Sequence, residues 1–123
     1  MKLTLDARTD VNLIRGYAAG AVRIGERLVS TPCIVAADTL ITGWEPASAT
    51  ELAASHLEPV FALNPQVVLL GTSAAQRFPS AQVREAFASR GIGLEPMDFR
   101  AACRTYNILV QEERRVVALL FPS

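Results

Sequence analysis

The segment that decides the fold covers residues 67–121 and reads VVLLGTSAAQRFPSAQVREAFASRGIGLEPMDFRAACRTYNILVQEERRVVALLF. Three stretches of it predict strands, at 67–71, 92–97 and 115–121, and the first and last of these contain apolar runs. The two stretches between them carry apolar residues at helical spacing. Strands that alternate with helices form parallel sheets with right-handed crossovers. The segment therefore predicts a parallel β-α-β-α-β unit.

Both helices of this unit have recognisable end signals. Pro79 and Ser80 open the first helix, and Gly91 follows its last turn, where a left-handed residue commonly ends a helix. Asp98 is expected to cap the second helix. The apolar residues at positions i, i+3 and i+4 that define the two buried stripes are Val83, Ala86 and Phe87 in the first helix and Phe99, Ala102, Cys103 and Tyr106 in the second.

The chain before this unit predicts mostly β structure in residues 1–50, whereas residues 51–123 alternate between helix and strand. Val22 and Ile24 flank Arg23 ahead of a turn, which is typical of a half-buried antiparallel hairpin. Two further strands are expected. One lies at Cys33–Ala37 and is covered on both faces, and the other lies at Ile41–Trp44.

A short helix is expected between the two parts. Ser55 and Glu58 fit a capping box, Pro59 then falls in the first turn, and the helix would run to about Leu63. With 123 residues, the chain has the length of one domain, which is usually about 100–150 residues. We expect a single compact α/β domain over 1–123, with three layers and a central mixed sheet, and with N-terminal β hairpins at the sheet edge or on one face.

The composition excludes several classes of function. Twelve basic residues balance twelve acidic ones, so nothing indicates a nucleic-acid partner. The apolar runs are far shorter than the about 20 residues of a membrane span, so no membrane insertion is expected. Two distant cysteines and one histidine do not make a zinc site, and no metal or cofactor is expected. Reduced thiols, and acidic residues within the first ten positions, indicate a cytoplasmic protein without a targeting segment.

The loop that follows the 67–71 strand is a candidate binding site, because ligands often bind beyond the carboxyl ends of parallel strands. Gly71 gives backbone freedom, Thr72 and Ser73 give hydroxyl groups, and Arg77 gives a positive charge. These are the parts of an anion cradle. The Asp98 junction is expected at the same edge. The alternative is an ordinary strand-to-helix loop with polar capping.

The second helix of the unit offers other candidates. Cys103 is either a nucleophile activated by Arg104 or His56, or a small residue of the core. The helical stripe favours the core, and His56 is expected at the surface or in a capping role. Arg100, Arg104 and Asn107 share one helix face, which is either solvated or binds a carboxylate, a phosphate or a partner protein.

Two aromatic residues upstream also admit two interpretations. Trp44 is the only tryptophan of the chain. Its default role is core packing, and its alternative role is to anchor an interface with a partner. Tyr17 could likewise belong to the core or to the surface.

Several of these residues carry a family resemblance. They are Gly16-Tyr17, Trp44, Gly71-Thr72, Arg77-Phe78-Pro79, Arg90-Gly91-Ile92-Gly93, Met97-Asp98, Ala102-Cys103-Arg104-Thr105-Tyr106-Asn107 and Arg114-Arg115-Val116. Together they resemble the family called domain of unknown function 498, over nearly the whole chain. The resemblance implies a compact three-layer α/β fold with a mixed sheet. Ser73 departs from the family pattern, in which a second glycine commonly follows Gly-Thr.

The same resemblance implies a function in assembly. The family includes a mitochondrial complex I assembly factor and an adipogenesis-associated protein, and it implies protein contacts rather than a known reaction or cofactor. We therefore expect a bacterial, non-catalytic protein-binding module, similar to an assembly factor, with a protein partner such as a respiratory complex or a second copy of the chain. The candidate binding residues are Gly71, Thr72, Ser73, Arg77, Asp98, Cys103, Arg104, Thr105, Tyr106 and Asn107. The alternative is a small-molecule or anion-binding enzyme that uses the loop after the 67–71 strand, with Cys103 or Asp98 as its reactive group.

Overall fold

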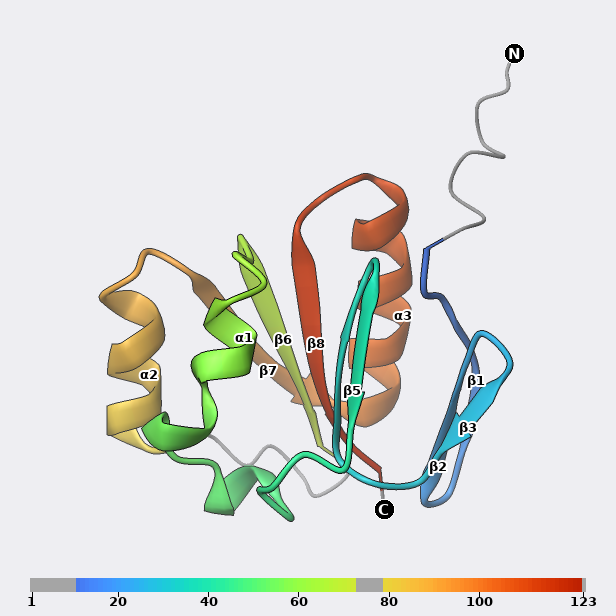
Figure 1. Cartoon of the computed structure of the whole chain (residues 1–123), viewed down its shortest axis with the longest axis horizontal. Coiled ribbons are helices and arrows are strands. Elements are labelled where there is room, and N and C mark those ends of the chain that lie inside the picture. Colours follow the sequence, from blue (N-terminus) through green and yellow to red (C-terminus); the bar gives the residue numbers. More distant parts are fainter. Residues whose placement is uncertain (1–10, 73–78, 123) are drawn as a thin grey trace.

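A computed structural model describes residues 11–72 and 79–122 (Figure 1). Along these residues the order of elements is β1 (Ile14–Ala18), β2 (Ala21–Ile24), β3 (Arg27–Val29), β4 (Cys33–Ala36), β5 (Thr39–Thr42), the 3-10 helices η2 (Ala49–Glu51) and η3 (Ala54–His56), α1 (Glu58–Phe61), β6 (Val67–Thr72), α2 (Ala81–Ala88), β7 (Gly93–Asp98), α3 (Phe99–Gln111) and β8 (Val116–Phe121).

The main sheet has the strand order β5-β4-β8-β6-β7. Strand β6 pairs in parallel with β7 on one side and with β8 on the other, so that Val67 lies opposite Gly93 and Val116. The β4–β5 hairpin extends the sheet by antiparallel pairing of β4 with β8. The predicted mixed sheet and its parallel β-α-β-α-β unit are therefore confirmed, with strand ends shifted by about one residue.

A second, antiparallel sheet consists of β1, β2 and β3. It packs beside α3 (Figure 1), and its buried residues Val22, Ile24 and Val29 share a core cluster with α3 and with one face of the main sheet. The N-terminal hairpins thus take both of the expected positions: β4–β5 lengthens the main sheet, and β1–β3 covers one side of the molecule.

The hydrophobic core has two parts, one on each face of the main sheet. Helix α3 and the β1–β3 sheet cover one face, and α1 and α2 cover the other. The buried strand β4 shows the division, because Cys33 and Val35 point toward α3 whereas Ile34 and Ala36 point toward α1 and α2. All four residues are buried, as expected for a strand that is covered on both faces.

The predicted helix ends are confirmed by their hydrogen bonds. The Ser80 hydroxyl accepts from the N–H of Val83 at 3.2 Å. At the other end of α2, Gly91 has a φ of +69°, and the N–H of Ile92 donates to the carbonyl of Phe87 at 3.1 Å, which is a Schellman motif. The Asp98 carboxylate accepts from two N–H groups in the first turn of α3, each at 3.2 Å.

Two predicted elements before β6 are wrong in detail. Strand β5 ends at Thr42, and Gly43, with a φ of +64°, takes the chain out of the sheet, so Trp44 lies outside any strand. Ser55 caps nothing, because it lies inside η3. Helix α1 has only four residues, and Pro59 stands in its first turn as expected. The predicted capping box does not form, because the buried Leu57 precedes α1 as its N-cap and Ser55 belongs to the preceding turn η3.

Candidate functional site

The carboxyl end of β6 brings some of the candidate residues together. Thr72 is buried and lies opposite Asp98 in the parallel register, so these two residues share one sheet edge as predicted. Gly71 is explained by packing, because a Cβ atom there would lie 2.7 Å from the Cβ of Ala102 on α3. Ser73 and Arg77, which would complete the anion cradle, lie outside the described residues.

The carboxylate at this edge has a structural partner. Both oxygens of Asp98 accept hydrogen bonds from the first turn of α3, from Arg100 and Ala101. A carboxylate at this position also interacts favourably with the positive end of the helix dipole. Asp98 therefore fixes the start of α3 beside the end of β6.

The thiol of Cys103 is buried in the core. It is 1% exposed, on the face of α3 that packs against the main sheet. Burial raises its pKa from 9.0 to about 12, Cys33 and Asp98 raise it further, and the nearby Arg104 opposes this rise. Burial also raises the pKa of Cys33 to about 12. Both cysteines are free and buried, as predicted, and a protonated thiol is a poor nucleophile.

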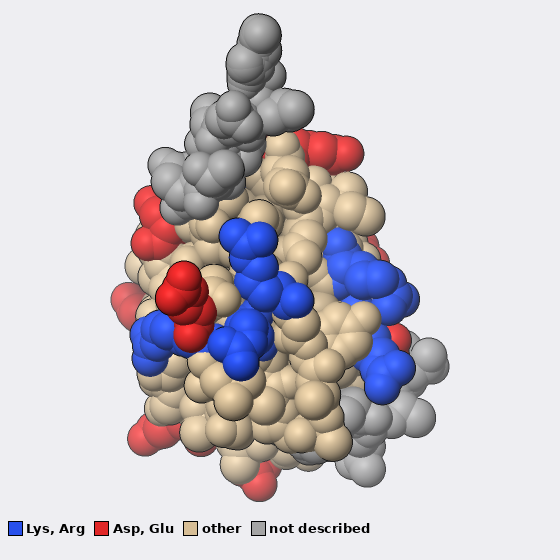
Figure 2. All heavy atoms as spheres, turned by 90° about the vertical axis from the view of Figure 1, so that its right-hand side faces the viewer, with Lys and Arg blue, Asp and Glu red and all other residues tan. Residues whose placement is uncertain are grey.

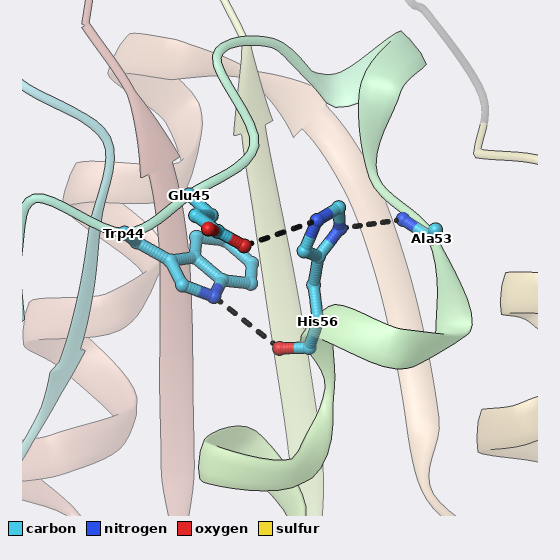
Figure 3. Close-up of polar contacts among 4 residues, drawn as sticks. All are labelled: Trp44, Glu45, Ala53 and His56. Carbon is cyan, nitrogen blue, oxygen red and sulfur yellow. Dashed lines mark hydrogen bonds and ion pairs between the residues drawn. The ribbon is translucent and has the colours of Figure 1, made fainter.

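His56 lies on the opposite side of the main sheet from Cys103, next to Trp44 (Figure 3). Its Nδ1 accepts from the N–H of Ala53 at 3.0 Å, so the ring caps the start of η3. Its Nε2 lies 4.0 Å from a carboxylate oxygen of the exposed Glu45. The expectation of a capping role for His56 is therefore confirmed.

Trp44 has the core role. It is 8% exposed, and its ring centroid lies 5.8 Å from that of Phe121. The indole N–H donates to the carbonyl of His56 at 3.3 Å. This bond ties the loop after β5 to η3, so Trp44 does not present its ring to a partner.

Tyr17 of β1 meets α3 through three contacts. The guanidinium of Arg104 donates to the Tyr17 hydroxyl at 3.4 Å, and the guanidinium of Arg100 lies 5.7 Å from the Tyr17 ring centroid. The ring itself meets Phe99 edge-on, with 6.3 Å between centroids. The two arginines that were predicted to share a helix face are therefore joined there by Tyr17.

The remaining residues of the Cys103–Asn107 motif hold the small sheet on α3. Asn107 exchanges two hydrogen bonds with the backbone of Ile14, at 2.9 and 2.8 Å. The buried Tyr106 donates its hydroxyl hydrogen to the carbonyl of Asn12 at 2.7 Å. Thr105, which precedes them in α3, is half-buried. Much of this motif therefore serves to dock β1.

The exposed side of the small sheet carries basic residues that sequence reasoning did not select. In β2, Val22 and Ile24 point inward and Arg23 points outward. Leu28 of β3 lies opposite Arg23 and is 62% exposed. On the other side of Arg23 stands Gly16, and no atom lies within 4 Å of where its Cβ would be. A shallow hollow of about 220 Å³ is lined by Gly16, Arg23 and Leu28 together with Arg15.

This side of the molecule is positively charged, as Figure 2 shows from the right-hand side of Figure 1. Strands β1–β3 with their turns, together with the Asp98–Gln111 segment, hold five arginines and only two acidic residues, although the chain as a whole has no net charge. We call this surface the basic face and define it by Arg15, Arg23, Arg27, Leu28, Arg100 and Arg104.

The fold described above is similar to that of known structures. An NMR structure of a Xanthomonas campestris protein superimposes with a TM-score of 0.82 at 37% sequence identity, covering 98% of this chain and 92% of that chain. Residues 14–121 match the family described as protein of unknown function (DUF498/DUF598). The chain belongs to this family, which confirms the resemblance found in the sequence.

Two curated proteins that are similar in sequence have names that indicate a role or a location. NADH dehydrogenase [ubiquinone] 1 alpha subcomplex assembly factor 3 of Danio rerio is 32% identical over 112 residues, which cover 89% of this chain and 64% of that protein. The 13 kDa major membrane protein of Francisella tularensis subsp. holarctica (strain LVS) is 36% identical over 66 residues, which are 54% of each chain. The matches thus cover between about half and two thirds of the length of these relatives.

Two further findings apply only to residues 11–72 and 79–122. No helix in these ranges is long and apolar enough to cross a membrane. Within the same ranges, no three His, Cys, Asp or Glu side chains come together as a metal site would require.

Proposed function

We propose that the protein is a non-catalytic binding module that assists the assembly of a multi-subunit protein complex. The observation that carries this proposal is the basic face, where two exposed arginines and an exposed leucine line a shallow hollow and three further exposed arginines lie on the same side of the molecule. Arginine is enriched at protein interfaces, because its planar group binds carboxylates and also packs against apolar surface. The name of the Danio rerio relative, an assembly factor, supports the same function.

The chemistry of this face indicates the partner. The positive charge favours an acidic segment, and electrostatic attraction would speed the encounter. Leu28 and the floor at Gly16 offer a place for one apolar side chain of that segment. Arg104 is held by Tyr17, so part of the face is ordered before the partner arrives.

The groups that an enzyme would need are engaged elsewhere. Burial keeps the Cys103 thiol protonated at neutral pH, and the Asp98 carboxylate caps α3. His56 caps η3 on the far side of the main sheet. These observations favour the binding module over an enzyme that uses Cys103 or Asp98.

A more specific form of the proposal concerns the complex and its location. We propose a cytoplasmic protein that acts on a respiratory NADH dehydrogenase complex during its assembly. The free thiols are compatible with a reducing compartment. The name of the Danio rerio relative supports an NADH dehydrogenase complex as the target, and the Francisella relative is itself named a membrane protein.

A photo-cross-linking residue at position 28 tests the proposal in cells. We expect an adduct with a subunit of one multi-subunit complex, and we expect Arg23→Glu to abolish it, because the charge reversal repels an acidic partner. The same cross-linker at Arg84, an exposed position on α2, is the matched control. An adduct at position 28 that is no stronger than the one at position 84, or that survives Arg23→Glu, would show that the basic face is not the binding surface.

A further inference from the structure

Besides the basic face, the molecule has a second cationic site. It lies at the amino ends of the parallel strands, whereas Thr72 and Asp98 lie at their carboxyl ends. Strands β6, β7 and β8 are parallel, so the three loops that lead into them meet at their amino ends, at the top of Figure 1. These loops, with Phe61 of α1, line a hollow of about 570 Å³. The volume falls within the range of about 300–1,000 Å³ that is typical of small-molecule sites.

The charge of this hollow is entirely positive. Arg90, Arg114 and Arg115 line it, and the other described lining residues include no aspartate or glutamate. Among the described residues, none of the three guanidinium groups has an acidic partner within ion-pair distance. Three like charges around one hollow repel one another, and an anion bound between them would remove this repulsion.

Two of the three arginines are held in place by the surrounding loops. The guanidinium of Arg90 stacks 4.0 Å above the centroid of the Phe61 ring, which leaves its N–H edges available. Arg115 donates from Nε to the carbonyl of Asn64 at 2.9 Å. This bond fixes the plane of the guanidinium and leaves its two terminal nitrogens available to a ligand. The site is therefore partly ordered before any ligand binds.

The loops that carry these arginines are also tied to each other. The N–H of Gln66 donates to the carbonyl of Arg115 at 2.8 Å, and the side-chain oxygen of Gln66 accepts from the N–H of Arg115 at 3.1 Å. The N–H of Gly93 donates to the carbonyl of Gln66 at 3.2 Å, which adds the loop after α2. Backbone bonds of this kind keep the three positive charges at one place.

We propose that this hollow binds a small molecule that carries a phosphate group. Guanidinium groups bind phosphate oxygens through paired N–H donors, and several fixed arginines discriminate in favour of a compact, multiply charged anion. The polar lining and the size of the hollow favour a small phosphorylated molecule over an apolar ligand. The site is distinct from the basic face, so it adds a ligand to the proposed protein-binding function.

Inorganic pyrophosphate is a suitable probe. We expect saturable binding in calorimetry at physiological ionic strength, and concentration-dependent shifts of the amide NMR signals of Gln66, Gly91 and Ile92. Sodium chloride at matched ionic strength should produce neither effect. Shifts spread evenly over the molecule, or the absence of saturable binding, would overturn the proposal.

Two variants and one control locate the site. Arg90→Gln and Arg114→Gln should each weaken pyrophosphate binding about tenfold or more, because each removes charged hydrogen bonds. Arg84→Gln, also an exposed arginine on this side of the sheet but outside the hollow, should bind as the wild type does. The amide NMR spectrum of each variant shows whether it is folded. Folded variants that bind as tightly as the wild type would overturn the site, and citrate that binds as tightly as pyrophosphate would overturn the choice of phosphate.

Discussion

Gly71→Ala is expected to destabilise the protein strongly, because this glycine allows α3 to lie directly on β6. The added methyl carbon would stand 2.7 Å from the Cβ of Ala102 and 3.1 Å from a methyl group of Leu120. Carbon atoms pack best at about 3.5–4.0 Å, so the helix would have to move away from the sheet. Overpacking of this kind costs about 1–3 kcal/mol. We expect about 3 kcal/mol, since the nearest obstacle is a Cβ atom that cannot rotate away.

A second substitution tests the cause of this loss. Ala102→Gly removes the opposing methyl group and by itself should cost about 2 kcal/mol, of which about 1 kcal/mol is helix propensity and about 0.8 kcal/mol is lost apolar burial. In the double variant the methyl group has moved from the helix to the strand, so the clash with Ala102 is gone and only the 3.1 Å contact with the flexible Leu120 side chain remains. We expect the double variant to lose only about 1–2 kcal/mol, far less than the two single variants together.

Urea denaturation followed by circular dichroism measures these free energies of unfolding. Gly16→Ala is the matched control, because no atom lies within 4 Å of its added Cβ, and its stability should change by less than about 0.5 kcal/mol. The packing explanation would be refuted by a Gly71→Ala variant as stable as the wild type. It would also be refuted by a double variant whose loss equals that of the two single variants combined.

Three further predictions concern stability. Because burial raises the pKa of Cys33 and Cys103 from 9.0 to about 12, the unfolded chain loses these protons first. The contribution of the two thiols to stability should therefore be fully present below pH 9 and fall as the pH rises toward 12, by about 1.4 kcal/mol per thiol at pH 10 in urea denaturation. A double alanine variant that keeps the full decline would contradict this. Asn107→Ala should cost about 2 kcal/mol and speed amide exchange in β1, since two hydrogen bonds to Ile14 are lost; unchanged exchange would count against it. Glu113, just after α3, has a φ of +65°, a backbone conformation that is strained for residues other than glycine. Glu113→Gly should therefore raise the thermal midpoint slightly, and a lower midpoint would contradict the idea that this backbone is strained.

The C-terminal half of the fold could be predicted because its signals are local. Apolar runs marked β6 and β8, the position of residues 92–97 between two helices marked β7, and Ser80, Gly91 and Asp98 marked the helix ends. The region around α1 could not be predicted in the same way. Ser55 and Glu58 satisfied a local capping rule, but the 3-10 turn η3 and the buried Leu57 determine where the helix begins.

The functional surfaces could be predicted only in part, because distant segments build them. The sequence placed Arg100 and Arg104 on one helix face, but only the fold brings Tyr17 to Arg104 across 87 positions. Likewise, the role of Asn107 depends on Ile14, which is 93 positions away. In the small sheet, outward-pointing polar residues alternate with inward-pointing apolar residues. This alternation predicts which residues point outward, but it does not predict that the arginines of distant segments lie on the same face of the folded chain.

The assembly state of the NADH dehydrogenase complex in cells that lack this protein tests the central claim most directly. Native gels of membranes would compare cells that carry the wild type, the Arg23→Glu variant and the Arg84→Glu control. We predict that the wild type and the control restore the full-size complex, whereas Arg23→Glu leaves incomplete assemblies although the variant is folded and equally abundant. Full-size complex in the cells without this protein, or full restoration by Arg23→Glu, would contradict the account.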